Sequence, residues 1–281
     1  MKKVILSAAK WANWMLCHCY LSVFPERSSL LAFFFHTIFR DKKEIELNVV
    51  KPMEKMTPQY FRQFIEYYLS HNYTFISPYD ILQGLSSEKK YVLITFDDGY
   101  FNNYHVLPVL KEYKVPAGFF ISTDHIKYNK CFWWDVVYRE RKKQRISEKD
   151  IVREIHHLKC KKVEEIEEYI IATFGETAFR PIGDIDRPFT PSELREFSKE
   201  KNVFIGNHTR NHAILTNYTP SEIKSLILDA QNSINELTGI TPEIISYPDG
   251  RYSDEVIRIA KEAGLRLGFT TQHKKNRLPV D

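Results

Sequence analysis

The sequence has little cysteine, and its cysteines do not form a recognisable site. The four cysteines stand at positions 17, 19, 131 and 160 of 281. Their spacing matches neither a zinc ribbon nor a redox C-x-x-C pair, which excludes these two kinds of cysteine site. We therefore expect four reduced thiols and a reducing compartment.

The sequence also has little net charge. Its 40 Lys and Arg residues against 36 Asp and Glu residues give a formal charge of +4. Basic runs occur at residues 139–145 and 159–162, but acidic residues at 164–168 follow directly, which is typical of solvated helix faces. No basic stripe is interleaved with a motif that reads nucleic acid, so we expect no nucleic-acid partner.

Long hydrophobic runs are absent. No stretch reaches the roughly 18 uninterrupted apolar residues of a membrane-spanning helix. The first residues begin like a signal peptide, but Lys10 interrupts the apolar run and no small-x-small cleavage site follows. An amphipathic helix over residues 1–27 fits better, and it could pack on the body of the protein or rest on a membrane surface. We expect a cytoplasmic protein, either free or at the inner face of the membrane.

Short apolar strands alternate with helical patterns along the rest of the chain. The expected strands are residues 30–36, 73–77, 91–96, 117–121, 203–206, 244–247 and 267–270. Alternation at this spacing favours a parallel sheet or barrel. Residues from about 138 to 175 break the rhythm with two charge-rich helical patterns. We predict one α/β domain over residues 28–281, a distorted (β/α) barrel with a helical insertion.

Two adjacent carboxylates follow the clearest of these strands. Asp97 and Asp98 come directly after residues 91–96, and Gly99 allows a sharp exit from the strand. Two neighbouring negative charges repel each other, so one of them usually needs a cation or a proton. Alone, such an Asp-Asp-Gly sequence is equally typical of a plain loop.

Two histidines four residues apart follow another expected strand. His208 and His212 would lie on one face of a helical turn, close enough to bind one ion. They should open at the same rim of the sheet as the aspartates. One carboxylate and two imidazoles suit zinc, cobalt or nickel, and leave positions open for water and substrate. The second carboxylate can then take a proton from the attacking water.

These motifs resemble those of a known family. TFDDG at residues 95–99 and H-T-x-x-H at residues 208–212 are similar to the first two motifs of polysaccharide deacetylases, the NodB-homology group (carbohydrate esterase family 4). FWWD at residues 132–135 and SYPDG at residues 246–250 support the resemblance. It implies a distorted β/α barrel that hydrolyses N-acetyl, or sometimes O-acetyl, groups on a glycan. It also implies the following roles: general base, Asp97; metal ligands, Asp98, His208 and His212.

The third motif departs from the family pattern. Many members have Arg-x-Pro-aromatic, in which the arginine positions the base, whereas Ser246 stands here at the arginine position. The resemblance still implies a loop whose main-chain N–H groups hold the developing oxyanion. That loop consists of Tyr247, Pro248, Asp249 and Gly250. Arg187 and Arg251 are the candidates to replace the arginine.

The general acid and the sugar contacts are less clearly marked. The Leu-x-His that family members carry near the end of the barrel is absent, and His36 and His273 are the candidates to replace it. Trp134 could stack on a sugar ring, although Trp133 and Trp134 together are also typical of packing. Asp135 could support the site from behind or accept a hydrogen bond from the substrate.

The sequence therefore predicts a hydrolase that removes acetyl groups from an amino-sugar glycan or sugar-lipid with a divalent ion, zinc first and cobalt or nickel next. Two alternatives remain open. A catalytically silent glycan-binding protein would bind sugar without releasing acetate. A metal hydrolase of small non-sugar amides would be indifferent to glycan length.

Overall fold

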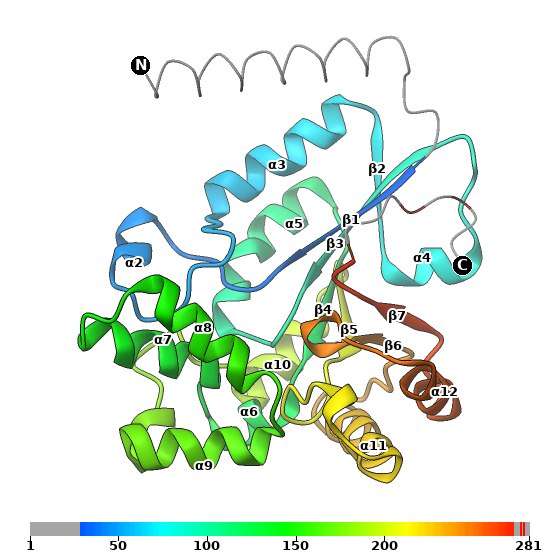
Figure 1. Ribbon diagram of the computed structural model, residues 1–281. Coiled ribbons are helices and arrows are strands. Elements are labelled where there is room, and N and C mark those ends of the chain that lie inside the picture. The colour runs from blue at the N-terminus through cyan, green and yellow to red at the C-terminus, as the bar shows by residue number, and fades with distance from the viewer. Residues whose placement is uncertain (1–28, 273–275, 277, 279–281) are drawn as a thin grey trace, which may run out of the picture.

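The computed structural model describes residues 29–272, 276 and 278. Within them, seven parallel strands form one sheet that curls into an open barrel surrounded by helices (Figure 1). The strands follow the order β1-β3-β4-β5-β6-β7, and β2 pairs with the first half of β3. Their bounds are β1 (Ser29–Phe35), β2 (Tyr73–Ile76), β3 (Lys90–Phe96), β4 (Ala117–Ile121), β5 (Val203–Asn207), β6 (Ile244–Ser246) and β7 (Leu267–Phe269). This parallel half-barrel confirms the predicted α/β fold class.

Helices connect successive strands and cover the outside of the sheet. They are α2 (Lys42–Glu46), α3 (Pro58–Ser70), α4 (Pro78–Gln83), α5 (Leu107–Tyr113), α6 (Thr123–Tyr128), α7 (Trp133–Lys143), α8 (Glu148–Leu158), α9 (Val163–Phe174), α10 (Pro191–Phe197), α11 (Pro220–Thr238) and α12 (Asp254–Glu262). Caps mark their ends: the Thr57 side chain accepts from Tyr60 N at the start of α3, and Gly239 closes α11 at φ 77°. None of the described helices is long and apolar enough to cross a membrane.

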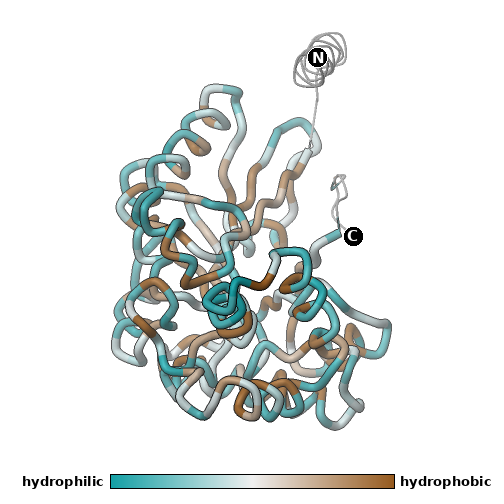
Figure 2. The backbone as a smooth tube through the Cα atoms, turned by 60° about the vertical axis from the view of Figure 1, so that its left-hand side comes forward, coloured by the Kyte–Doolittle hydropathy of each residue, from teal (hydrophilic) through white to brown (hydrophobic). Residues whose placement is uncertain are grey.

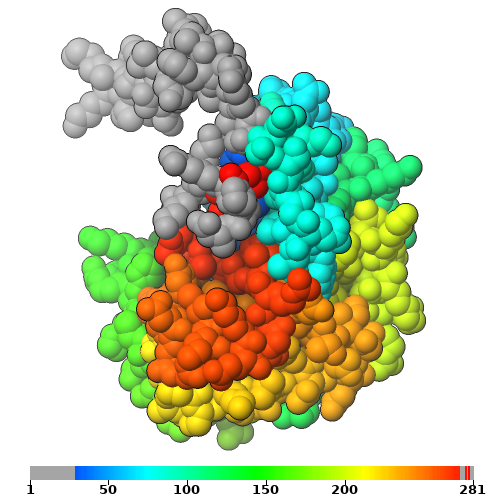
Figure 3. Space-filling model, turned by 90° about the vertical axis from the view of Figure 1, so that its right-hand side faces the viewer, coloured from blue at the N-terminus to red at the C-terminus, as the bar shows by residue number. Residues whose placement is uncertain are grey.

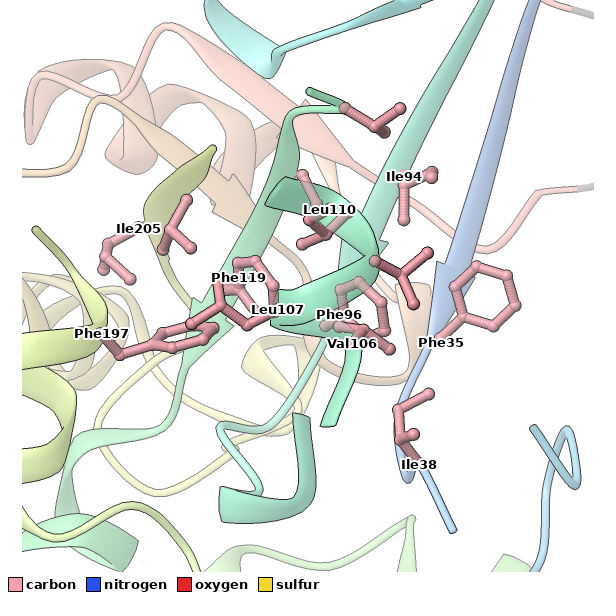
Figure 4. Packing of buried hydrophobic residues seen from close by; sticks show 14 of the residues in the cluster. Phe35, Ile38, Ile94, Phe96, Val106, Leu107, Leu110, Phe119, Phe197 and Ile205 are labelled. Atoms are coloured by element: carbon pink, nitrogen blue, oxygen red, sulfur yellow. The ribbon is translucent and has the colours of Figure 1, made fainter. Parts of the chain in front are cut away.

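The main core lies between the sheet and helices α3, α5 and α10. Phe96 of β3 stacks on Phe119 of β4 with 4.8 Å between ring centroids, and Phe197 of α10 meets Phe119 edge-on (Figure 4). The strand segments are largely hydrophobic in Figure 2, whereas many peripheral turns are hydrophilic. Burying each such side chain stabilises the fold by about 1.5–3 kcal/mol. This packing holds the strand ends in place.

The helical insertion is larger than expected. The insertion consists of three helices, α7, α8 and α9, rather than the two expected. It begins at Trp133, ahead of the predicted limit near residue 138. The first half of α7 is buried on all sides, from Trp133 to Arg139, so it carries no amphipathic pattern. Only the charged second half of α7 has a sequence pattern that predicts a helix. The insertion has its own core, which includes Trp134, Ile155 and Ile170.

Several expectations fall outside the described residues. These are the amphipathic helix over residues 1–27, the thiols of Cys17 and Cys19, and His273. Cys131 and Cys160 are free cysteines.

The half-barrel is open between its two edge strands. No pairing of β1 with β7 occurs among the described residues. Leu30 of β1 instead forms an isolated antiparallel bridge with Asn276, which follows β7 in the chain. Figure 3 shows this side, where the red C-terminal segment lies beside the cyan segment that includes α4. Phe269 of β7 packs there, as Ile81 does, against a buried cluster that includes Leu30 and Leu93. The polar residues of the candidate site lie at the carboxyl ends of the parallel strands.

Candidate active site

Asp98, His208 and His212 form a compact group of ligands, called here the candidate centre. One ligand atom from each residue lies within 4.8 Å of the other two. Asp98 Oδ1 is 3.3 Å from His208 Nε2 and 3.4 Å from His212 Nε2. Asp98 follows β3 and His208 follows β5, so the shared carboxyl edge of the parallel sheet brings them together. Among the described residues, no second group of this kind occurs.

The candidate centre fits a divalent cation. Asp98 is 1% exposed, and neither of its carboxylate oxygens has a hydrogen-bond partner. Burial raises the pKa of Asp98, but the imidazoles of His208 and His212 outweigh burial and hold that pKa well below its usual range. Burying an ionised carboxylate without a hydrogen-bond partner costs roughly several kcal/mol of folding free energy, unless a cation compensates the charge. One oxygen and two nitrogen ligands suit zinc, cobalt or nickel.

The backbone of the centre is strained. Asp98 and His212 have φ values of 79° and 57°, a region that non-glycine residues rarely adopt. Gly99 follows at φ 90° and gives the sharp exit that the sequence predicted. Such strain persists only where the surroundings enforce it, and it concentrates at functional sites.

Residues 208–212 form a turn, and the helical turn expected from the histidine spacing is wrong. Thr209 has φ 63°, which no right-handed helix allows. Side chains replace the helical hydrogen bonds: Asn207 Oδ1 accepts from Thr209 N at 2.7 Å, and Thr209 Oγ1 accepts from Ala213 N at 2.8 Å. The turn nevertheless directs His208 and His212 to the same carboxylate.

Asp97 has the surroundings of a proton acceptor. It is 6% exposed, its Oδ2 accepts a hydrogen bond from Ser246 Oγ at 3.1 Å, and its Oδ1 has no partner. Burial raises the pKa of Asp97, and the charge of Asp98 adds to this, although His208 and His36 oppose it. A buried carboxyl with a raised pKa and one unengaged oxygen is suited to general-base chemistry.

The partner of Asp97 is therefore Ser246, which stands at the arginine position of the third motif. The two arginines considered as replacements are engaged elsewhere. Arg187 pairs with Asp184 and Glu193, and Arg251 pairs with Asp249. Neither arginine therefore pairs with Asp97 in place of the third-motif arginine.

His36 lies at the end of β1 and pairs with a residue that the sequence gave no reason to single out. His36 Nδ1 is 2.8 Å from Glu54 Oε1. Burial lowers the pKa of His36, but the hydrogen bond to Glu54 and the charges of Asp98, Glu54 and Asp97 together raise it to about 9. His36 is thus an imidazolium at neutral pH and can donate a proton.

The third-motif loop offers fewer oxyanion donors than expected. Tyr247 N donates to Phe269 O and Gly250 N donates to Tyr247 O, while Pro248 has no N–H. Within the described structure, Asp249 N is the remaining donor of the loop without an acceptor. The Asp249 carboxylate pairs with Lys159, at the end of α8, and with Arg251.

Trp134 and Asp135 lie in the first turn of α7, and Trp134 is next to His212 of the candidate centre. The Trp134 ring centroid is 4.5 Å from that of His212, and the side chain is 8% exposed, so it leaves little surface for a sugar ring. Asp135 accepts hydrogen bonds from Tyr100 Oη at 2.5 Å and from Lys51 N at 2.8 Å. Both oxygens of this buried carboxylate are thus engaged by groups of the protein itself. Tyr100 was missed because no motif marks it.

Comparisons with known proteins agree with this geometry. The polysaccharide deacetylase family profile matches residues 84–268, more than half of the chain. The polysaccharide deacetylase homologue YxkH of Bacillus subtilis (strain 168) is 24% identical over 217 residues. That alignment covers 75% of this chain and 57% of the Bacillus protein, so the chain spans little more than half of that relative.

Solved structures share the fold. The Streptococcus pyogenes deacetylase PplD, in complex with acetate, superimposes with a TM-score of 0.60 at 19% identity, over 88% of this chain and 86% of PplD. IcaB from Ammonifex degensii gives a TM-score of 0.56 at 18% identity, over 89% of this chain and 86% of IcaB. Fold, site geometry and sequence profile lead to one conclusion: the chain belongs to the polysaccharide deacetylase family.

Proposed function

We propose that the protein is a metal-dependent hydrolase that removes acetyl groups, chiefly N-acetyl groups, from an amino-sugar glycan or glycan precursor. One observation carries the proposal: the buried carboxylate of Asp98 faces two imidazoles, has no hydrogen-bond partner, and adjoins a second buried carboxyl, Asp97. Family membership supports a carbohydrate substrate. The acetate bound to the related Streptococcus pyogenes deacetylase supports an acetyl group as the part that is removed.

Asp98, His208 and His212 would hold the cation. A divalent ion bound there supplies a Lewis acid for the acetyl carbonyl and the attacking water, and zinc, cobalt or nickel suits this ligand set. Because neither oxygen of Asp98 is taken up by a hydrogen bond, this carboxylate can bind the ion without first breaking one.

Asp97 acts as the general base. Ser246 Oγ holds Oδ2, so Oδ1 is left to accept the proton of the attacking water. Burial raises the pKa of Asp97, which makes its carboxylate a stronger base than that of an ordinary aspartate. Asp249 N is available as the main-chain donor to the oxyanion that forms.

His36 acts as the general acid. Its protonated ring is held by Glu54 and can pass a proton to the amine nitrogen as the bond to the acetyl carbon breaks. An amine leaving group needs this proton, whereas a sugar alcohol from an O-acetyl ester needs it less.

The test is acetate release from N-acetylglucosamine oligomers of increasing length and from a small non-sugar acetamide. Each substrate is incubated with zinc- or cobalt-loaded protein, chelated protein and the Asp97→Asn variant, with Asp150→Asn as a control on the exposed surface of α8. We expect metal-dependent release that increases with oligomer length and disappears in Asp97→Asn alone.

Two results would overturn the proposal. Oligomer binding by fully loaded protein without acetate release would identify a silent glycan-binding protein. Equal rates on the small amide and on every oligomer would identify an amidase that does not recognise glycans.

A further inference from the structure

The two histidines of the candidate centre are oriented in different ways. His208 Nδ1 is 2.8 Å from the main-chain oxygen of Ser246, which directs Nε2 toward Asp98. His212 also turns Nε2 toward Asp98, but its Nδ1 is buried without a hydrogen-bond partner among the described residues. Metal-binding histidines almost always donate their second N–H to a fixed acceptor, which sets the ring orientation. His212 must be held in another way.

The indole of Trp134 occupies the space beside the His212 ring. The two ring centroids are 4.5 Å apart and the planes are inclined at 57°. Trp134 is in turn packed against Phe132 and Trp133, with ring centroids 5.1 and 5.4 Å away. Close packing of this kind leaves the imidazole little room to rotate, so it can replace the missing hydrogen bond.

The indole is held by the first of three hydrogen bonds that form a chain. Trp134 Nε1 donates to Tyr100 Oη at 3.0 Å, and Tyr100 Oη donates to Asp135 Oδ2 at 2.5 Å. The main-chain N–H of Lys51 donates to the other oxygen of Asp135 at 2.8 Å. The order of donors is forced, because an indole N–H can only donate and the Tyr100 hydroxyl must then give its own hydrogen to Asp135.

This chain of hydrogen bonds is buried, so each of its members depends on the others. Tyr100 and Asp135 are each 1% exposed, and a polar group that lost its partner there would stay unsatisfied. Tyr100 directly follows the Asp-Asp-Gly turn at residues 97–99. The loop that carries the base and the carboxylate ligand therefore also sets the position of the indole.

We propose that Trp134 is a positioning residue that holds His212 by ring packing, and that Tyr100 and Asp135 hold Trp134. This inference rests on the proposed function, because it takes the candidate centre as a metal site. Its consequence is specific: metal affinity depends on a tyrosine hydroxyl that contacts none of the three ligands.

The decisive variant is Tyr100→Phe, which keeps the ring and removes one hydroxyl. Zinc affinity is measured by competition with a chromophoric chelator, and ligand geometry from the visible absorption spectrum of the cobalt-loaded protein. We expect the zinc Kd to rise about 10- to 100-fold, the range found when groups that orient metal ligands are removed. The cobalt spectrum should change as the His212 ring moves. Trp134→Phe should act in the same direction.

Tyr104→Phe is the matched control. Tyr104 lies four residues away and is 38% exposed, and no hydrogen bond engages its hydroxyl within the described chain. Its zinc Kd and cobalt spectrum should equal those of the wild type. The melting temperature of each chelated variant separates loss of folding from loss of positioning.

The outcomes separate this inference from the proposed function. A lower melting temperature for Tyr100→Phe with an unchanged zinc Kd and cobalt spectrum would overturn the inference, since the hydroxyl would then serve folding alone. A wild-type protein that binds neither zinc nor cobalt would instead overturn the metal site itself.

Discussion

Asp97 and Asp98 are adjacent in the sequence, yet their surroundings shift the pKa values of the two carboxyls in opposite directions. Burial and the neighbouring charge raise the pKa of Asp97, whereas the imidazoles lower that of Asp98 in spite of its burial. Pairs of titratable groups whose pKa values are pushed apart are typical of sites that divide two tasks between them. The separation supports Asp98 as ligand and Asp97 as base.

The two asparagine variants should fail in different ways. Asp98→Asn removes the charge that compensates the cation, so we expect bound zinc to be lost. Asp97→Asn should keep bound zinc but lose activity by about 10²- to 10⁴-fold, the usual contribution of general-base catalysis. Metal content and acetate release are measured on the same samples. Equal zinc content in both variants would contradict the division of roles.

The pH dependence of activity should reflect His36. Its pKa is raised above the ordinary 6.5 to about 9, so the acid form is fully populated below 6.5 and is lost as the pH rises through 9. A bound cation repels the imidazolium and moves this loss to lower pH. We expect activity to decline on the alkaline side, and His36→Gln to abolish that limb of the profile with a lower kcat. The exposed His71→Gln serves as control, and an unaltered alkaline limb in His36→Gln would exclude His36 as the acid.

Residues with their own chemistry close to the end of a predicted strand could be identified from the sequence. This applies to Asp97, Asp98 and His208, because a strand end fixes where the next side chain lies. Ser246 as the partner of Asp97 could not be identified, since 149 positions separate the two residues. Glu54 stands in an irregular segment, where no periodic pattern places a side chain.

At the scale of elements, the third-motif loop requires glycine at position 250. Gly250 has φ 67°, and an added Cβ would lie 2.1 Å from Thr271 Oγ1 and 2.6 Å from Thr271 N. We expect Gly250→Ala to lower the free energy of unfolding by about 1–3 kcal/mol. Gly183→Ala is the control, because nothing lies within 4 Å of its added Cβ, and it should change stability by no more than about 0.5 kcal/mol. Urea denaturation measures both, and equal stabilities would contradict this account of the loop.

The insertion shows where prediction of elements fails. A helix buried on all sides, such as the first half of α7, has no polar face to reveal its period. The anchoring of the insertion is also not local: Asn217 Nδ2 donates to the main-chain oxygens of Lys159 and Lys161 at 3.0 and 2.9 Å. Together with the ion pair from Lys159 to Asp249, these contacts join the insertion to the rim of the site.

At the scale of the whole molecule, the alternation of strands and helices was sufficient to predict a parallel α/β barrel. The order of the strands was not. β2 and β4 pair with different halves of the same side of β3, and β1 remains an edge strand. Such pairing depends on contacts between distant segments, which local periodicity does not contain.

Metal binding should stabilise the whole fold. A ligand that binds only the folded state at 100 times its Kd adds about 2.7 kcal/mol to the free energy of unfolding. We expect zinc or cobalt to raise the melting temperature of chelated wild-type protein by several degrees, and to leave His212→Ala almost unchanged. Calorimetry provides the measurement, and an equal increase in His212→Ala would place the stabilising ion elsewhere.

The most direct test of the account is a titration of chelated protein with zinc or cobalt, in which bound metal and acetate release from N-acetylglucosamine oligomers are followed together. We predict that acetate release rises in proportion to occupancy and saturates at one ion per chain. Full occupancy without acetate release, or release by the chelated protein, would contradict a metal-dependent deacetylase.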